Sequence, residues 1–250
     1  MLKEAVRDFS IVEEVRHAFL GKVLLVEHSL LKNRFFLIEL DHQFIEPVDH
    51  FEKMARILPY IAKIDHPHIL KIHDTFFYEG KWYLAYDASF FAENGWMIPS
   101  LYFSSCKDFE FEDDLAQFSY QLASALDYAK SLPFDKPFYH GGLNLNNILV
   151  KKDGSDLKTY LLDFGIASVF SSDFYLAHLQ KRQESSSYDS FNLYQAIDCL
   201  APEQKTSAYQ PGDKIDAYAF GAVLYYLLKG HFPYGLDVDL SFESQKLDWA

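Results

Sequence analysis

The sequence predicts an α+β protein of two lobes, in which a small antiparallel sheet with one helix precedes a larger, mainly helical lobe. Alternating segments rich in Val, Phe and Leu fill the first forty residues, as is typical of strands. Helical spacing dominates the chain after residue 88. The 250 residues, 49% of them hydrophobic, allow one domain of two lobes or two small domains. We place the small lobe at 1–87, the large lobe at 88–250, and a hinge near 86–90.

The small lobe is expected to contain five strands and one helix. Period-two alternation predicts strands at 9–15, 22–28 and 34–40. A helix is expected after Pro47, whose fixed φ suits a first turn, and Pro59 marks its end or a kink. Two further strands are expected in 68–77 and 81–87, joined by a turn that contains Gly80.

The large lobe is expected to contain two long helices. Residues 111–132 carry an apolar stripe that includes Leu115, Phe118 and Leu122, with acidic residues in the first turn. Residues 215–230 are apolar on all sides and end at a glycine, which predicts a helix buried in the middle of the lobe.

The net charge and the cysteine content limit the classes of partner and the cellular compartment that we expect. The chain has 36 acidic and 23 basic residues, a net charge of −13, which repels nucleic acid and anionic membrane surfaces. The longest apolar run is too short to span a bilayer, so no membrane insertion is expected. Cys106 and Cys199 lie far apart and fit reduced thiols in the cytoplasm. Export by a signal that the sequence does not reveal stays open.

Five short motifs follow one another at consistent spacing. They are HPHIL from His66, H-x-x-L-x-x-x-N-I-L from His140, Asp163-Phe164-Gly165, Ala201-Pro202-Glu203, and D-x-Y-x-x-G from Asp216. This ordered set resembles the protein kinase family, and most closely its bacterial Ser/Thr kinase-like members. The resemblance covers about 9–234 and stops before the family's last helices. It therefore implies a bilobal kinase-like fold that is short at its C-terminus.

The resemblance assigns chemistry to the loop that follows His140. Asp163 and Asn147 match the family's two magnesium ligands. Gly142 stands in the place of the catalytic Asp, because the loop keeps the family's length. Asn144 stands in the place of the loop Lys that contacts the transferred phosphate. No catalytic residue is therefore intact in this loop, and a positioned base is typically worth about 10²- to 10⁴-fold in rate.

The small lobe departs further from the family. The register of the V-A-I-K strand puts Glu39 in the place of the Lys that grips the phosphates, and Leu37 in the place of the Ala over the adenine ring. Tyr86 is large at the gatekeeper position before the hinge. Nucleotide contacts that the resemblance still allows are weak and would come from Gly21, Val23, Leu37 and Asp87. Gly21 is the only one left of the three glycines of the phosphate loop.

Two further partner positions are also changed. The helix Glu that pairs with the strand Lys falls on Met54 or Ile57, both apolar, and a reversed pair of Glu39 with Lys53 is an alternative. The resemblance places the serines between 171 and 187 in the loop that active relatives order by phosphorylation. Because Gly141 replaces the Arg that would hold their phosphates, we expect them to be ordinary residues of a flexible loop.

These losses predict a catalytically inactive pseudokinase that binds, scaffolds or regulates a protein partner and needs no cofactor. The alternative is a divergent Ser/Thr protein kinase or other nucleotide transferase that uses ATP and magnesium. A third reading is that the chain is part of a longer protein whose function resides elsewhere.

Overall fold

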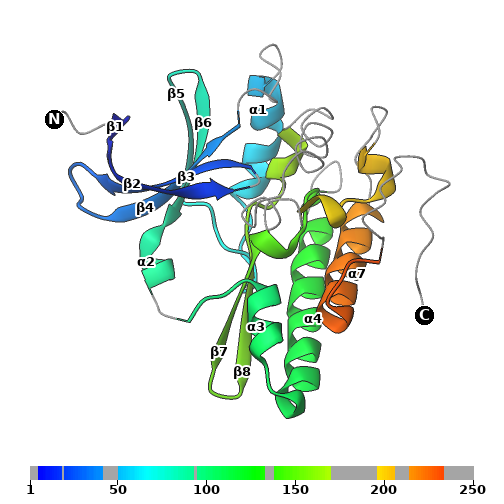
Figure 1. Cartoon of the computed structure of the whole chain (residues 1–250). Helices are drawn as coiled ribbons and strands as arrows, with labels where there is room; N and C mark the ends of the chain where they lie inside the picture. The colour runs from blue at the N-terminus through cyan, green and yellow to red at the C-terminus, as the bar shows by residue number, and fades with distance from the viewer. Residues whose placement is uncertain are drawn as a thin grey trace, which may run out of the picture.

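The computed structural model describes residues 5–18, 20–41, 50–92, 95–132, 138–169, 196–205 and 214–233. It has two lobes, with the sheet and α1 in the upper part and α3, α4 and α7 in the lower part (Figure 1). The predicted α+β, kinase-like class is confirmed. The sheet's last residue is Asp87, and the first helix of the larger lobe begins at Ala88.

The small lobe is built on one antiparallel sheet with the strand order β1-β2-β3-β4-β6-β5. Its strands are β1 (Ala5–Val6), β2 (Phe9–Ala18), β3 (Gly21–His28), β4 (Arg34–Leu40), β5 (Asp74–Tyr78) and β6 (Lys81–Asp87). Every strand predicted from alternation is present, although β5 begins six residues later than expected. The turn between β5 and β6 has positive φ at Glu79 and Gly80, 46° and 83°, as a tight hairpin requires.

The sheet has two apolar faces, and alternation along each strand decides which side chain lies on which face. The outer face is a separate cluster that contains Phe9, Phe35, Leu37, Phe76 and Tyr83. The inner face joins the core of the larger lobe and contains Val23, Ile38, Leu40, Leu84 and Tyr86. Consecutive residues of β4 therefore point alternately toward and away from the larger lobe.

Helix α1 (His50–Ile61) packs its apolar stripe against the inner face. Met54, Ile57 and Ile61 are all buried, and Pro59 lies in the last turn, close to the predicted end. After α1, His66 reaches helix α4 through a 3.2 Å contact between its Nε2 and Ser124 Oγ. The backbone N–H of Asp65 donates to Tyr128 Oη at 3.1 Å, so this segment ties the small lobe to the larger one.

The larger lobe surrounds α4 with shorter elements. They are α2 (Ala88–Ala92), α3 (Pro99–Ser105), α4 (Asp108–Ser131), η2 (Leu145–Asn147), β7 (Ile148–Asp153), β8 (Asp156–Leu161), η3 (Ile166–Val169), η4 (Pro202–Lys205) and α7 (Lys214–Lys229). Phe118, Leu122 and Ala125 of the predicted stripe are fully buried. The β7–β8 hairpin was not predicted, although Asp153-Gly154 between alternating residues is a strong hairpin signal.

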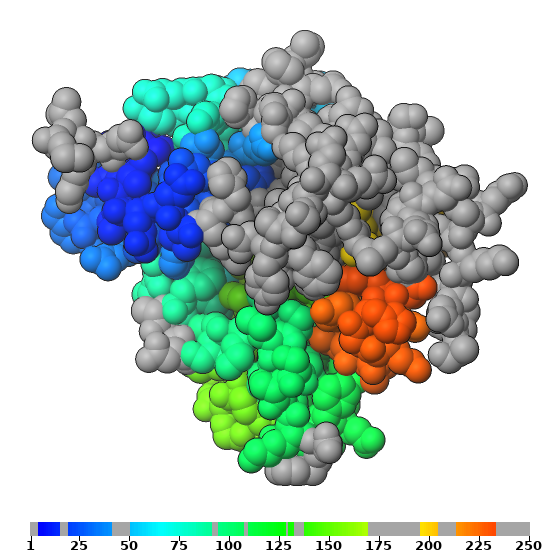
Figure 2. All heavy atoms as spheres, in the orientation of Figure 1, coloured from blue at the N-terminus to red at the C-terminus, as the bar shows by residue number. Residues whose placement is uncertain are grey.

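Helix α7 is less enclosed than its sequence predicts. It ends as expected, because Gly230 has φ +76° and its N–H donates to Tyr226 O at 2.8 Å. However, Leu228 is 59% exposed and Gly221 is also exposed. The expectation of burial on every side is therefore wrong for this helix. Figure 2 shows α7 as a coloured area at the surface, well separated from the sheet.

Two absences can be stated for the described ranges. No helix there is both long and apolar enough to cross a membrane. No group of three His, Cys, Asp or Glu side chains there could hold a metal ion. The serines between 171 and 187, which were expected to be flexible-loop residues, lie outside the described residues.

Candidate active site

The loop after Phe138 is held from below by α7. Both carboxylate oxygens of Asp216 accept hydrogen bonds, from His140 N at 2.8 Å and Gly141 N at 2.9 Å. The His140 ring accepts from Gly142 N at Nδ1 (3.2 Å) and lies 2.8 Å from Leu162 O at Nε2. A neutral ring with its proton on Nε2 satisfies both contacts, and burial lowers the pKa of His140. This histidine organises the loop and has no nitrogen left to act as a base.

The two glycines of the loop occupy positions that reject side chains for different reasons. Gly141 has φ +80°, a region that favours glycine. Gly142 lacks this constraint, but a Cβ on it would lie 2.8 Å from the Cβ of Ala167 in η3. The loop backbone has thus settled against η3 in the space that a side chain at position 142 would need.

Asn144 and Asn147 use their side chains to hold the same loop. Asn144 Oδ1 accepts from Asn146 N at 2.9 Å and its Nδ2 donates to Gly142 O at 2.8 Å. Asn147 Oδ1 accepts from Asn144 N, and its Nδ2 donates to Gly142 O, both at 2.9 Å. Both residues are buried. Their amides cap η2 and fasten its backbone to Gly142.

Asp163 lies next to this loop and is bonded to the small lobe. Leu162 N donates to Asn147 O at 2.8 Å, which places Asp163 beside Asn147. The hydroxyl of Tyr86 donates to Asp163 Oδ1 at 2.6 Å and accepts from Asp163 N at 3.0 Å. Burial, and then the neighbouring carboxylate, raise the pKa of Tyr86 well above its ordinary value, so the hydroxyl stays protonated.

The residues after Asp163 are packed under the loop. The ring of Phe164 meets those of His140 and Phe138 with centroids 5.2 and 5.6 Å apart. A Cβ on Gly165 would lie 2.2 Å from the Phe138 ring, so only glycine fits there. Asp163 itself has φ 59°, a conformation that is uncommon for a residue with a side chain.

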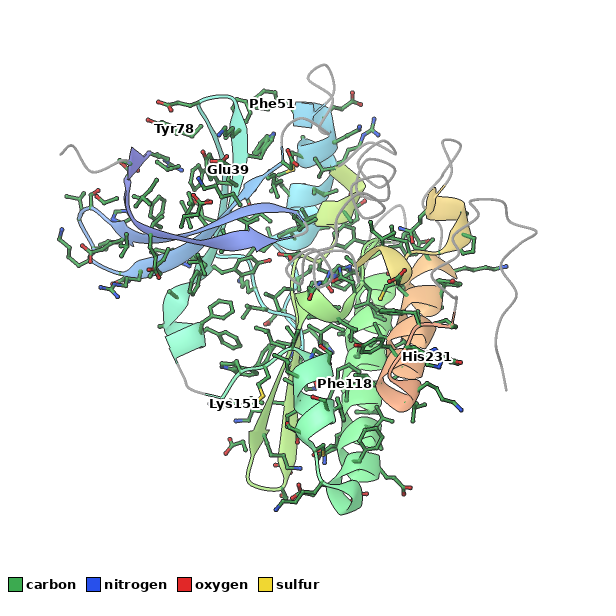
Figure 3. All side chains as sticks on the ribbon, in the orientation of Figure 1. Glu39, Phe51, Tyr78, Phe118, Lys151 and His231 are labelled. Atoms are coloured by element: carbon green, nitrogen blue, oxygen red, sulfur yellow. The ribbon has the colours of Figure 1, made fainter. Side chains whose placement is uncertain are left out.

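The cleft face of β4 is apolar. Val23 pairs with Ile38, and Gly21 pairs with Leu40, and all four residues are buried. Ile38 and Leu40 point to the inner face, whereas Glu39 points to the outer one. There, Glu39 accepts a bond from Lys81 Nζ at 2.6 Å and another from Tyr83 Oη at 3.0 Å. Figure 3 shows Glu39 in the upper part of the sheet, toward Tyr78 and away from α4.

Comparisons with known proteins agree with this geometry. Residues 19–248 match the family model described as "Protein kinase domain". The chain belongs to the protein kinase family. It is 27% identical over 236 residues to serine/threonine-protein kinase pkn1 of Chlamydia caviae, and 22% identical over 228 residues to Pkn1 of Chlamydia trachomatis. The first match covers 93% of this chain and the second 91%, but each covers only 35% of the relative.

Solved kinase structures share the fold. The kinase domain of Mycobacterium tuberculosis PknI matches with a TM-score of 0.63 and 21% identity, over 96% of this chain and 80% of that chain. A second structure of the same domain gives a TM-score of 0.62 and 20% identity, over 94% and 78% of the two chains. At these identities, the likeness concerns the fold alone.

Two positions predicted from the kinase motifs need correction. Leu37 and Glu39 do not line the cleft, because they alternate onto the outer face, where Leu37 is buried beside Phe35. The predicted register is off by one residue, and Ile38 and Leu40 lie toward the cleft instead. The alternative ion pair of Glu39 with Lys53 is replaced by the one with Lys81. The cleft strand still offers a nucleotide no cation, since both of these inward positions are hydrocarbon.

The other predicted residues lie in or beside the kinase cleft, and their contacts differ. Gly142, Asn144, Asn147 and Asp163 come together as described. Gly21 and Val23 begin β3, and a Cβ on Gly21 would lie 2.0 Å from Glu39 O, so strand pairing alone demands this glycine. Asp87 is exposed, and its Oδ1 accepts from Ser89 N at 2.8 Å. That bond supports the start of α2.

Sequence reasoning missed two features of the kinase cleft. One is the bond between Tyr86 and Asp163, which joins residues 77 positions apart. The sequence predicts a large side chain at Tyr86, but it does not indicate which residue would accept a hydrogen bond from the Tyr86 hydroxyl. The other is the packing of Ala167 on Gly142. Small residues at both positions would have been a clue, because two backbones can then approach closely.

Proposed function

We propose that this domain is a non-catalytic member of the protein kinase family that binds and regulates a protein partner. The observation that carries the proposal is the close packing of Gly142 against η3. The catalytic position has no carboxylate, and a Cβ on Gly142 would lie 2.8 Å from the Cβ of Ala167, so the loop is packed for a residue without a side chain.

The surrounding chemistry supports the same conclusion. Phosphoryl transfer depends on positioning and on charge stabilisation by cations. Asn144 stands at the position of the loop Lys, and its side-chain amide caps η2 and donates to Gly142 O. The inward residues of β4 are Ile38 and Leu40, and the hydroxyl of Tyr86 occupies an oxygen of Asp163. Each of these changes removes a charge or fills space that a nucleotide would need.

A magnesium ion would have to compete for its two expected ligands. The family would hold it through Asp163 and Asn147, where it would neutralise phosphate charge. Asp163 Oδ1 already accepts from Tyr86, and Asn147 Oδ1 from Asn144 N. The residues present therefore fit a metal ion poorly.

The second candidate function is a divergent kinase or other nucleotide transferase that uses ATP and magnesium. The observation in its favour is that Asp163 and Asn147 persist and lie side by side. This reading requires the bond from Tyr86 to Asp163 to open when nucleotide enters. Because the chain covers about a third of its curated relatives, the activities of those whole proteins belong to this proposal as well.

A thermal-shift titration separates the two functions. A ligand at 100 times its Kd stabilises the folded state by about 2.7 kcal/mol. We expect the midpoint of unfolding to stay unchanged with millimolar ATP and magnesium or manganese. A rise in the midpoint that Asp163→Ala abolishes would show nucleotide binding through Asp163, which contradicts our reading of the site and supports the transferase.

A partner is sought with the same material. The purified domain, immobilised, should retain a protein from its own cell lysate, and Tyr120→Glu or Leu30→Glu at exposed positions (76% and 85%) should map the face used. Retention that is lost on adding ATP and magnesium would instead indicate that the domain binds nucleotide, as the second candidate function requires.

A further inference from the structure

Two separate sets of contacts join the lobes of this domain, one at the back of the cleft and one along its connecting segment. We propose that together they hold the lobes in one closed arrangement without any nucleotide, with the Tyr86 hydroxyl serving as an internal ligand of Asp163. The domain would then present a fixed two-lobe surface at all times.

The contact at the back of the cleft is the bond between Tyr86 and Asp163. Tyr86 belongs to β6 in the small lobe, and Asp163 follows β8 in the larger one. One hydroxyl both donates to the carboxylate, at 2.6 Å, and accepts from the backbone N–H, at 3.0 Å. Tyr86 is 1% exposed. A hydrogen bond to a charged group in such a dry setting is stronger than a neutral one.

This bond also fixes the segment that Asp163 begins. Because the hydroxyl holds both the backbone N–H and the carboxylate, it restrains Asp163 in its uncommon positive-φ conformation. Phe164 is held at the same time against His140. Opening the lobes at β6 would therefore pull directly on the loop that carries these residues.

The second set of contacts follows the connecting segment. Helix α2 leaves β6 and lies between the sheet and the β7–β8 hairpin (Figure 1). Its two phenylalanines point to different lobes: Phe91 packs edge-on against Phe36 of β4 (5.1 Å), while Phe90 stacks on Trp96 (4.8 Å) and meets Tyr160 of β8 (4.9 Å). Phe90 and Phe91 also contact each other at 5.2 Å. The rings form one unbroken chain from the small lobe to the large one.

The far end of this chain is fastened to the hairpin. Trp96 Nε1 donates to Phe90 O at 3.2 Å, and Lys151 Nζ lies 5.5 Å from the Trp96 ring centroid. Met97 and Val150 exchange two backbone hydrogen bonds, of 2.9 and 2.8 Å. Figure 3 shows Lys151 at the hairpin end of this region. The described parts of the segment that would act as a free hinge, 88–91 and 95–97, are thus packed against both lobes.

The proposal is tested by measuring the distance between the lobes. Spin labels carried by unnatural amino acids at positions 30 and 228, which are 85% and 59% exposed, report this distance by pulsed electron resonance and leave both native cysteines in place. We expect a single narrow distribution for the wild-type domain, unchanged by ATP with magnesium. A broad wild-type distribution, or one that narrows on adding nucleotide, would overturn the proposal.

Variants separate the effect of the contacts between the lobes from the effect of general stability. Tyr86→Phe should broaden the distribution and speed amide hydrogen exchange in residues 163–169 by about 10- to 100-fold. Tyr83→Phe is the matched control, since its hydroxyl also bonds a carboxylate, that of Glu39, but within one lobe. It should leave the distribution as in the wild type. If Tyr86→Phe behaves like Tyr83→Phe, the proposal is wrong.

A second variant covers the case in which Tyr86→Phe does not fold. Phe91→Ala interrupts the ring chain at a half-buried site, and it should broaden the same distribution. An unchanged distribution would contradict the role given to α2. None of these measurements needs catalysis or a partner, so their failure is distinguishable from failure of the proposed function.

Discussion

Adding one methyl group at position 142 tests how the catalytic loop is packed. Gly142→Ala places a Cβ 2.8 Å from Ala167 Cβ, well inside normal carbon contact distance, so one backbone must move. Overpacking of this kind typically costs about 1–3 kcal/mol. For a protein of this size, 1 kcal/mol shifts the unfolding midpoint by about 2–4 °C. We therefore expect Gly142→Ala to lower the midpoint by about 2–12 °C.

The clash has a partner, which allows a double-mutant cycle. Ala167→Gly removes the opposing methyl group and should make the change at position 142 less costly. The coupling between the two substitutions should then be favourable by about 0.5–3 kcal/mol. Urea unfolding of the wild type, both single variants and the double variant gives the four free energies needed.

Gly221→Ala is the control for this experiment. A Cβ on Gly221 would meet nothing within 4 Å, and the residue lies in the interior of α7. This substitution should stabilise the domain by about 0.5–1 kcal/mol. If Gly142→Ala is as well tolerated as Gly221→Ala and shows no coupling to Ala167, the loop has room for a side chain and our argument from Gly142 fails.

Four further outcomes follow from the structure. Glu39→Lys should leave the response to ATP in thermal-shift titrations unchanged, because the side chain at position 39 points away from the cleft. Leu40→Ala should lower the free energy of unfolding in urea by about 2–5 kcal/mol, because Leu40 is fully buried and points inward. Burial lowers the pKa of both His66 and His68 in the folded state. Their contribution to stability is therefore fully present above about pH 6.5 and should be lost as the pH falls through the folded-state pKa values. Replacing both residues by Gln should flatten this dependence in unfolding midpoints measured from about pH 7.5 to about pH 5. Phe118→Ala should cost about 3–5 kcal/mol in the same unfolding assay, because its ring is fully buried.

Elements with strong periodicity could be predicted from the sequence. The strands predicted at 22–28, 34–40 and 81–87 are present as β3, β4 and β6, and the stripe on α4 buries the residues that helical spacing selects. The order of short motifs indicated the family, because each motif serves a packing role that the fold retains. The bonds of Asp216 to the His140 loop are one such role.

The register of β4 could not be fixed from the sequence. In the segment FFLIEL, apolar residues stand on both faces of the strand, so hydrophobicity does not say which ones face the cleft. A slip of one residue exchanges the faces. Only the pairing of Val23 with Ile38 decides the matter, and it shows that Glu39 points outward.

Contacts between distant residues were also beyond the sequence. The bond from Tyr86 to Asp163 and the contact of Gly142 with Ala167 depend on how two lobes and two loops meet. Local patterns carry no information about such distances. The short helix α2 was missed for a related reason, since its two phenylalanines are fixed by rings in both lobes.

We propose that this kinase-family domain keeps the fold without transferring phosphate. The most direct measurement is incorporation of label from γ-labelled ATP by the purified domain, with magnesium or manganese, into itself and a generic protein substrate. We expect incorporation no higher than in the Asp163→Ala variant. Label that accumulates with time in the wild type and disappears in that variant would contradict it.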